Sequence, residues 1–301
     1  MKKWLIRAGF GLLGLVLLAM VAVVVLSRVG DRKAQRRLDV QLQPLALRSD
    51  AAALERGAYL FRSRGCTECH GVDGGGKDVV NDGKGMRIHA PNITPAPGTV
   101  VAQYRTEDWD RSIRHGVAPN GRPLIVMPSE DYNRLTDADF GALVGYLRQM
   151  PAAEGGGAAI ELPLIVRALY GAGAIGDAAG KIDHLLPAPQ PVPEAVSDAH
   201  GAYVANTCIG CHGEGLSGGK IPGAPPEWPA AANLTPGAGS VMVSYPDANA
   251  FVAMMRSGQR PSGSAVSKVM PFQALAQMSD TDLQAVYLHL KRLPARAAGS
   301  R

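Results

Sequence analysis

The stretch Cys66-Thr67-Glu68-Cys69-His70 has a second copy, Cys208-Ile209-Gly210-Cys211-His212, and the two copies contain all four cysteines of this 301-residue chain. In the Cys-x-x-Cys-His motif of c-type haem attachment, the two thiols bond to the porphyrin and the adjacent histidine coordinates the iron. We therefore predict two covalently bound haem c groups. The predicted attachment and iron-binding residues are Cys66, Cys69 and His70 for haem 1, and Cys208, Cys211 and His212 for haem 2.

Cys-x-x-Cys also occurs as half of a zinc site and as a redox-active dithiol. A zinc site would require the two motifs to meet at one tetrahedral centre. A thioredoxin-like dithiol opens a helix in a βαβ unit, and the sequence shows no such unit. Because neither alternative needs a histidine directly after each second cysteine, the paired histidines favour haem.

The sequence around each motif is duplicated as well, at an offset of 142 residues between Cys66 and Cys208. Three further segments of the first half recur in the second. They are Gly57-Ala58-Tyr59, Asn92-Ile93-Thr94-Pro95 and Leu135-Thr136-Asp137-Ala138-Asp139, matched by Gly201-Ala202-Tyr203, Asn233-Leu234-Thr235-Pro236 and Met278-Ser279-Asp280-Thr281-Asp282. We expect two copies of one domain, each with one haem.

The repeat also selects a sixth ligand for each iron. Of the ten methionines, Met127 and Met270 recur in register, and a proline follows each of them. Proline biases the preceding residue towards an extended conformation, which suits a loop that crosses a haem face. We predict His/Met ligation, with Met127 on haem 1 and Met270 on haem 2. The competing ligand at the first site is His115, whose repeat counterpart is Ser257.

His/Met ligation has a functional consequence. Thioether sulfur favours ferrous iron and so raises the reduction potential, and the two ligands fill both axial positions. Such an iron carries electrons and does not readily bind oxygen or peroxide. We therefore predict no catalytic residues and a role as an electron carrier.

The N-terminus predicts a membrane helix. Residues 8–27 are uncharged and mostly apolar, and about 20 such residues are needed to cross the hydrocarbon core. The alternative is a cleaved signal peptide, whose apolar region has about 7–15 residues and ends at a small-x-small site. Because the stretch here is longer and shows no clear site, we favour an uncleaved single-pass anchor.

Positive charge gathers beside this helix. Residues 1–37 contain eight Lys/Arg and one Asp, a net charge of +7, whereas the whole chain carries +5, which leaves −2 for residues 38–301. The cluster from Arg28 to Arg37 suits contact with membrane lipid headgroups, and we expect no nucleic-acid partner. The positive-inside rule favours a cytoplasmic body, but long domains translocate largely regardless of charge. Since haem is attached outside the cytoplasmic membrane, we expect the haem domains on the periplasmic or outer side.

The expected organisation has five parts. They are an anchor with its basic flank (1–37), domain 1 (38–152), a bridge (153–195), domain 2 (196–295) and a tail (296–301). Helix starts are predicted at Asp50, Thr136 and Ser279, and a glycine-rich loop over residues 71–85. The apolar middle of the bridge, residues 162–175, predicts either a helix packed between the two haem domains or a patch against the membrane or a partner. Low aromatic content (5%), 36 glycines and 22 prolines favour short helices joined by ordered loops.

A family resemblance rests on several of these motifs over residues 50–295. In domain 1 they are Cys69-His70-Gly71, Asn92-Ile93-Thr94-Pro95, Trp109-Asp110-x-x-Ile113-Arg114-x-Gly116-Val117, Met127-Pro128 and Leu135-Thr136-Asp137-x-Asp139. This pattern resembles the multihaem cytochrome c subunits of bacterial membrane-bound alcohol, aldehyde and gluconate dehydrogenases. The resemblance implies class-I-like cytochrome c domains of mostly α fold in the bacterial inner membrane. With the repeat and the apolar N-terminus, we expect two tandem class-I-like cytochrome c domains behind one N-terminal transmembrane helix.

The chain departs from the family in carrying two haem motifs where well-known members carry three, and in an N-terminal anchor where many members attach by a C-terminal segment. The second Met loop, residues 258–271, is also rearranged. The expected partners are a membrane dehydrogenase or a quinol-oxidising complex as donor, and a terminal oxidase or another acceptor. The alternative function is a dihaem cytochrome c peroxidase, which would need one iron with an open or displaceable site. A haem-based sensor has no feature in its favour.

Overall fold

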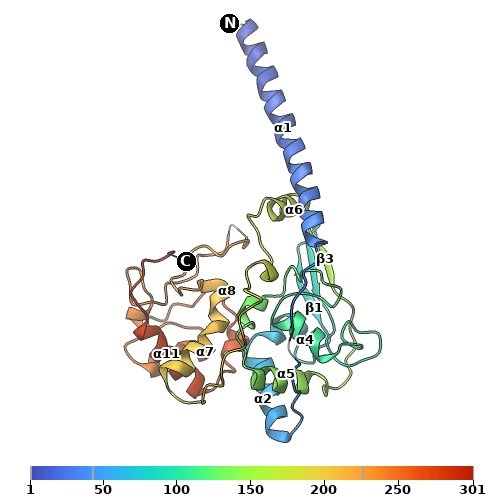
Figure 1. The fold of residues 1–301 in the computed structure, drawn as a ribbon. Coiled ribbons are helices and arrows are strands. Elements are labelled where there is room, and N and C mark those ends of the chain that lie inside the picture. The colour runs from blue at the N-terminus through green and yellow to red at the C-terminus, as the bar shows by residue number, and fades with distance from the viewer. Residues whose placement is uncertain (1, 43, 226, 301) are drawn as a thin grey trace.

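A computed structural model describes residues 2–42, 44–225 and 227–300. Two mostly helical lobes lie side by side, and one long helix projects from the body (Figure 1). The blue-to-green lobe is domain 1 and the orange-to-red lobe is domain 2. The predicted mostly α fold is confirmed.

The projecting helix is α1 (Lys2–Ala34), a continuous helix of 33 residues. The expected span, residues 8–27, lies within it. It is long and apolar enough to cross a membrane, and its most apolar window is not buried against the rest of the chain. A signal sequence would share these properties, so the choice between the two depends on how α1 is attached to the body.

The helices of domain 1 begin where the capping residues place them. They are α2 (Ala51–Ser63), α3 (Cys66–His70), α4 (Thr106–Ile113), the short 3-10 turn η1 (Ser129–Asp131) and α5 (Asp137–Leu147). The Asp50 side chain accepts a hydrogen bond from the backbone N–H of Ala53 at 3.1 Å, and Thr136 accepts one from Asp139 at 3.2 Å. Each cap satisfies an amide that the first helical turn leaves unpaired, which confirms both predicted helix starts.

Domain 2 repeats this order. Its helices are α7 (Asp198–Ala205), the 3-10 turn η3 (Asn206–Cys208), α8 (Ile209–His212), the 3-10 turn η4 (Met242–Ser244), α9 (Ala248–Ser257), α10 (Phe272–Leu275) and α11 (Asp280–Arg292). Ser279 caps α11 by accepting from the N–H of Asp282 at 3.1 Å, as predicted. Because Ser279 is the counterpart of Thr136, the last helix starts in the same way in both domains.

A glycine lies at each crossing of the first and last helices of a domain. A Cβ added to Gly57 of α2 would lie 2.2 Å from the carbonyl oxygen of Ala142 in α5. A Cβ added to Gly201 of α7 would lie 2.0 Å from that of Ala285 in α11. Both distances are far below van der Waals contact, so only glycine permits these close crossings. The repeated Gly-Ala-Tyr of the sequence thus marks the helix pair on which each domain is built.

A small sheet distinguishes domain 1. Strands β1 (Lys77–Asn81), β2 (Arg87–Ala90) and β3 (Ala159–Glu161) pair antiparallel in the order β1-β2-β3. The expectation of a simple loop over residues 71–85 was therefore wrong, since β1 lies within it. The pairing was not visible in the sequence because β3 comes from the bridge, about 70 residues after β2 along the chain.

The bridge helix α6 (Leu164–Gly171) packs against α1. A Cβ added to Gly171 would lie 2.0 Å from the carbonyl oxygen of Leu26, so the two backbones touch directly. Arg167 pairs with Asp31 at 3.0 Å, and Arg36 pairs with Asp177 at 2.6 Å. Of the two expectations for residues 162–175, the helix packed between the two haem domains is corrected, because α6 packs against α1. The other, a patch against the membrane or a partner, stays an expectation.

Candidate haem sites

Each predicted proximal histidine is oriented by a backbone carbonyl. Nδ1 of His70 lies 2.9 Å from the carbonyl oxygen of Pro91, and Nδ1 of His212 lies 2.8 Å from that of Ala232. A hydrogen bond from Nδ1–H leaves Nε2 as the nitrogen with a lone pair for a metal. Burial lowers the pKa of His70, against the opposing effect of its bond to Pro91. The neutral ring that coordinates iron is thereby favoured.

The cysteines of each motif lie on the same short turn as the histidine. In domain 1, Gly65 adopts a left-handed conformation with φ of +84°. This residue separates α2 from α3, and the attachment turn begins directly after it. Burial raises the pKa of the Cys66 and Cys208 thiols to about 12 in both domains. Both sulfur atoms therefore face an apolar interior, where the apolar porphyrin edge would lie.

Domain 2 contains an apolar cavity with an empty volume of about 720 Å³, part of which opens to solvent. Cys208, His212 and Met270 all line it. The structure therefore brings the attachment motif and the predicted sixth ligand of haem 2 to one cavity, and this donor set and lining suit a haem.

Four other methionines line the same cavity, namely Met242, Met254, Met255 and Met278. They are 1–5% exposed and belong to the hydrophobic core of domain 2, against which Met270 packs as a partly buried residue. Met270 is thus the methionine that recurs in the repeat, and it lies at the edge of the core. Both observations support Met270 as the sixth ligand of haem 2, which stays a prediction.

In domain 1, Cys66 and Met127 pack against one hydrophobic cluster. Met127 is partly buried, and η1 begins two residues after it. The competing ligand, His115, faces away into the bridge, where its Nδ1 lies 3.0 Å from Nδ1 of His184. Burial and the neighbouring His184 lower the pKa of His115 to about 4. The contact with His184 gives His115 a structural role and favours Met127 as the ligand.

Two arginines at equivalent positions in the repeat form ion pairs with acidic side chains. Arg114 pairs with Asp137 at 2.9 Å, and Arg256 pairs with Asp280 at 2.6 Å. Asp137 and Asp280 occupy equivalent positions in the repeat, as do the two arginines. The duplicated Arg–Asp pair joins the helix before the Met loop to the helix after it, in α4–α5 and again in α9–α11.

Comparison with known families assigns both halves. The model of the cytochrome c family matches residues 54–151, and that of subunit III of cbb3-type cytochrome c oxidase matches residues 194–290. The chain contains two cytochrome c domains. Two such domains, each with one Cys-x-x-Cys-His motif, carry two covalently bound haem c groups. The predicted cofactor is therefore confirmed, while the individual iron ligands stay predictions.

Similar proteins are cytochrome subunits of dehydrogenases. The gluconate 2-dehydrogenase cytochrome c subunit of Pantoea cypripedii is 38% identical over 101 residues, which cover 32% of this cytochrome and 22% of that protein. The fructose dehydrogenase cytochrome subunit of Gluconobacter japonicus is 32% identical over 111 residues, covering 35% and 23%. The quinone-dependent alcohol dehydrogenase cytochrome c subunit of Gluconacetobacter polyoxogenes is 32% identical over 103 residues, covering 33% and 22%. The matched part thus spans less than a quarter of each relative.

Sequence reasoning did not foresee Pro91 and Ala232 as the carbonyl partners of the two histidines. Both lie just before the duplicated Asn-(Ile/Leu)-Thr-Pro segment, whose asparagine is almost fully buried in each domain. In each copy the asparagine accepts hydrogen bonds from the threonine two residues later, both from its backbone N–H and from its hydroxyl. The repeated Asn-x-Thr was the available signal, since it holds this loop beside the proximal histidine.

Proposed function

We propose that this dihaem cytochrome is a membrane-anchored electron-transfer subunit, which passes electrons from a dehydrogenase or quinol-oxidising complex to an oxidase or another acceptor. The observation that carries the proposal is the duplicated site, in which an oriented histidine and a recurrent Met-Pro loop accompany each Cys-x-x-Cys-His motif. The similarity to cytochrome subunits of gluconate, fructose and alcohol dehydrogenases supports a dehydrogenase as the donor.

The residues of each site have separate tasks. The cysteines hold the cofactor covalently, and Pro91 and Ala232 orient His70 and His212. Met127 and Met270 provide the sixth ligand and thereby exclude small molecules from the iron. The haem supplies one-electron chemistry, with each iron alternating between its ferrous and ferric states. Two closed sites disfavour the peroxidase alternative, which needs an open one.

The packing of α6 supports an anchor that is retained. Leu26, Gly30 and Asp31 are all in contact with α6, so removing α1 would expose the face of α6 that these residues cover. A signal peptide has no reason to pack so closely against the mature body. We therefore propose a single-pass anchor in the cytoplasmic membrane with the haem domains on the periplasmic or outer side.

The ligand assignment is tested by replacing Met127 or Met270 with alanine. Each variant should lose the His/Met spectroscopic signature of one haem and lower the reduction potential of that haem, while the other haem is unchanged. Met86→Ala is the matched control, because Met86 has no counterpart in the repeat. Unchanged spectra and potentials in both ligand variants would contradict the assignment, and a high-spin wild-type protein that turns over peroxide would favour the enzyme.

The partner is tested by purifying the tagged full-length protein from native membranes. We expect a dehydrogenase or a quinol-oxidising complex to co-purify, and substrate oxidation by that complex to reduce both haems. If the protein were purified without either class of complex, the proposal that it accepts electrons from one of them would be contradicted.

A further inference from the structure

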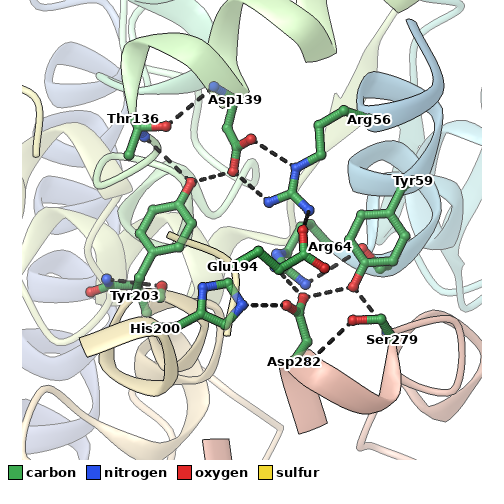
Figure 2. Close-up of polar contacts among 12 residues, drawn as sticks. Arg56, Tyr59, Arg64, Thr136, Asp139, Glu194, His200, Tyr203, Ser279 and Asp282 are labelled. Carbon is green, nitrogen blue, oxygen red and sulfur yellow. Dashed lines mark hydrogen bonds and ion pairs between the residues drawn. The ribbon is translucent and has the colours of Figure 1, made fainter. Parts of the chain in front are cut away.

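Two tyrosines join the domains in a crossed arrangement. The hydroxyl of Tyr59 in domain 1 donates to Asp282 of domain 2 at 2.6 Å, and the hydroxyl of Tyr203 in domain 2 donates to Asp139 of domain 1 at 2.6 Å. Figure 2 shows both contacts side by side at the interface between the lobes. Tyr59 and Tyr203 are counterparts in the repeat, and so are Asp139 and Asp282.

The two tyrosine hydroxyls also contact the residues that cap the last helix of the other domain. The backbone N–H of Ser279 donates to the Tyr59 hydroxyl at 2.9 Å, and that of Thr136 donates to the Tyr203 hydroxyl at 3.4 Å. Each hydroxyl therefore inserts into the N-terminus of the last helix of the other domain. In a two-fold interface, residue i of the first copy contacts residue j of the second, and residue j of the first copy contacts residue i of the second. The two domains are thus paired by a pseudo-two-fold axis within one chain.

Basic side chains complete both halves of this crossed cluster. Arg56 binds Asp139 through two nitrogens at 2.8 Å, and its repeat counterpart His200 contacts Asp282 at 2.7 Å. Arg64 adds a further bond to Asp282 across the interface at 2.8 Å, and both side chains are almost fully buried. Burial alone would raise the pKa of the two carboxyls, but the arginines outweigh this effect and both pKa values lie below the usual range. The acceptors are therefore held ionised.

The pseudo-two-fold axis also places each Met loop against the attachment turn of the other domain. The turn η1, which follows Met127, packs on α8 of domain 2, and α10, which follows Met270, packs on α3 of domain 1. Asp131 of η1 accepts a hydrogen bond from the N–H of Gly210, inside the second haem motif, at 2.8 Å. The two predicted haem sites therefore contact each other through short segments of chain.

We propose that Tyr59 and Tyr203 are positioning residues for electron transfer between the two haems, because their crossed bonds hold each Met loop against the attachment turn of the other site. This inference rests on the proposed relay function. In the transfer, one electron moves from the reduced site to the oxidised site, so one iron is oxidised as the other is reduced and no further reactant is required. The tyrosines act through domain placement alone.

The test compares Tyr59→Phe, Tyr203→Phe and the double variant in the full-length protein. The rate at which the two haems equilibrate after flash reduction should fall several-fold in the double variant and by a smaller, similar factor in each single variant. Haem content, the His/Met signature and the two reduction potentials should stay as in the wild type. Tyr146→Phe is the matched control, since Tyr146 packs on Phe61 inside domain 1 and should leave the rate unchanged.

An equilibration rate in the double variant equal to that of Tyr146→Phe, with intact spectra, would overturn the proposal. If the double variant does not fold, the single variants decide the question, because each keeps one half of the crossed cluster. Failure of the proposed function gives a different result, namely a wild-type protein without the His/Met signature at both haems.

Discussion

At the scale of the residue, the two haem sites differ most at the contact between Asp131 and Gly210. Asp131 has Ala274 as its repeat counterpart, and Gly210 has Glu68. A Cβ added to Gly210 would lie 2.8 Å from both carboxyl oxygens of Asp131, so a side chain at this position would displace the acid. The acid–glycine contact therefore belongs to one half of the interface and makes the duplicated sites unequal.

Asp131 should give the protein a pH-dependent stability. Burial raises the pKa of this carboxyl to about 7, above its value of 3.8 in an unfolded chain. The folded state thus binds the proton more tightly, so this contribution to stability is complete below pH 3.8 and is lost as the pH rises to about 7. Denaturant unfolding of Asp131→Asn across this range should lack that loss, while the exposed control Glu154→Gln should retain it. Equal pH profiles for Asp131→Asn and the wild type would contradict the prediction.

At the scale of the element, each domain depends on one glycine-mediated helix crossing. The crossings of α2 with α5 and of α7 with α11 bring a helix backbone into contact with its partner, and the tyrosine two residues after each glycine then reaches the other domain. One short repeated segment, Gly-Ala-Tyr, thus serves packing within a domain through its glycine and pairing between domains through its tyrosine.

Gly201→Ala should destabilise domain 2, because the added methyl group meets the backbone carbonyl of Ala285. Overpacking of this kind costs about 1–3 kcal/mol. Chemical unfolding of the holoprotein measures the loss, and Gly57→Ala should show a similar loss in domain 1. Gly157→Ala serves as control, since a Cβ there meets open space. If Gly201→Ala had wild-type stability, α7 and α11 could move apart without lowering the free energy of unfolding, which would contradict the prediction.

The sequence predicted some of the elements and their contacts but not others. The caps at Asp50, Thr136 and Ser279 follow local chemistry and were found where the sequence placed them. The pairing of β2 with β3 and the docking of α6 on α1 were missed, because both join segments far apart in the chain through patterns with no local signature. The pairing of β1 with β2 is a local hairpin, and the prediction of a loop over residues 71–85 overlooked it. The crossed tyrosines are an intermediate case: their repetition with Asp139 and Asp282 was visible, but a repeat does not reveal that its members contact one another.

At the scale of the whole molecule, the haem body is joined to α1 by more than a linker. The pairs Arg167–Asp31 and Arg36–Asp177 flank the close approach of Gly171 to α1. The outer face of α6 is apolar, with Leu164, Ile165 and Leu169 each 41–54% exposed. The body is therefore held at one orientation to the helix axis.

Gly171→Leu should release this attachment without affecting the haems. The larger side chain cannot fit against the carbonyl of Leu26, so we expect faster amide hydrogen exchange in residues 28–37 of the protein in lipid nanodiscs. Gly9→Leu is the control, because Gly9 lies in α1 at a position where an added Cβ meets open space. Unchanged exchange in Gly171→Leu would mean that α6 does not hold the anchor.

The crossed cluster of Tyr59, Asp139, Tyr203 and Asp282 also bears on the history of the chain. Contacts that obey a two-fold axis are those of a homodimer, in which one surface must complement itself. Duplication and fusion of a gene for such a one-haem homodimer would produce this interface directly. Fusion then frees each half to change independently. Arg56 and its counterpart His200 differ, which is a difference that two identical copies of one chain could not have.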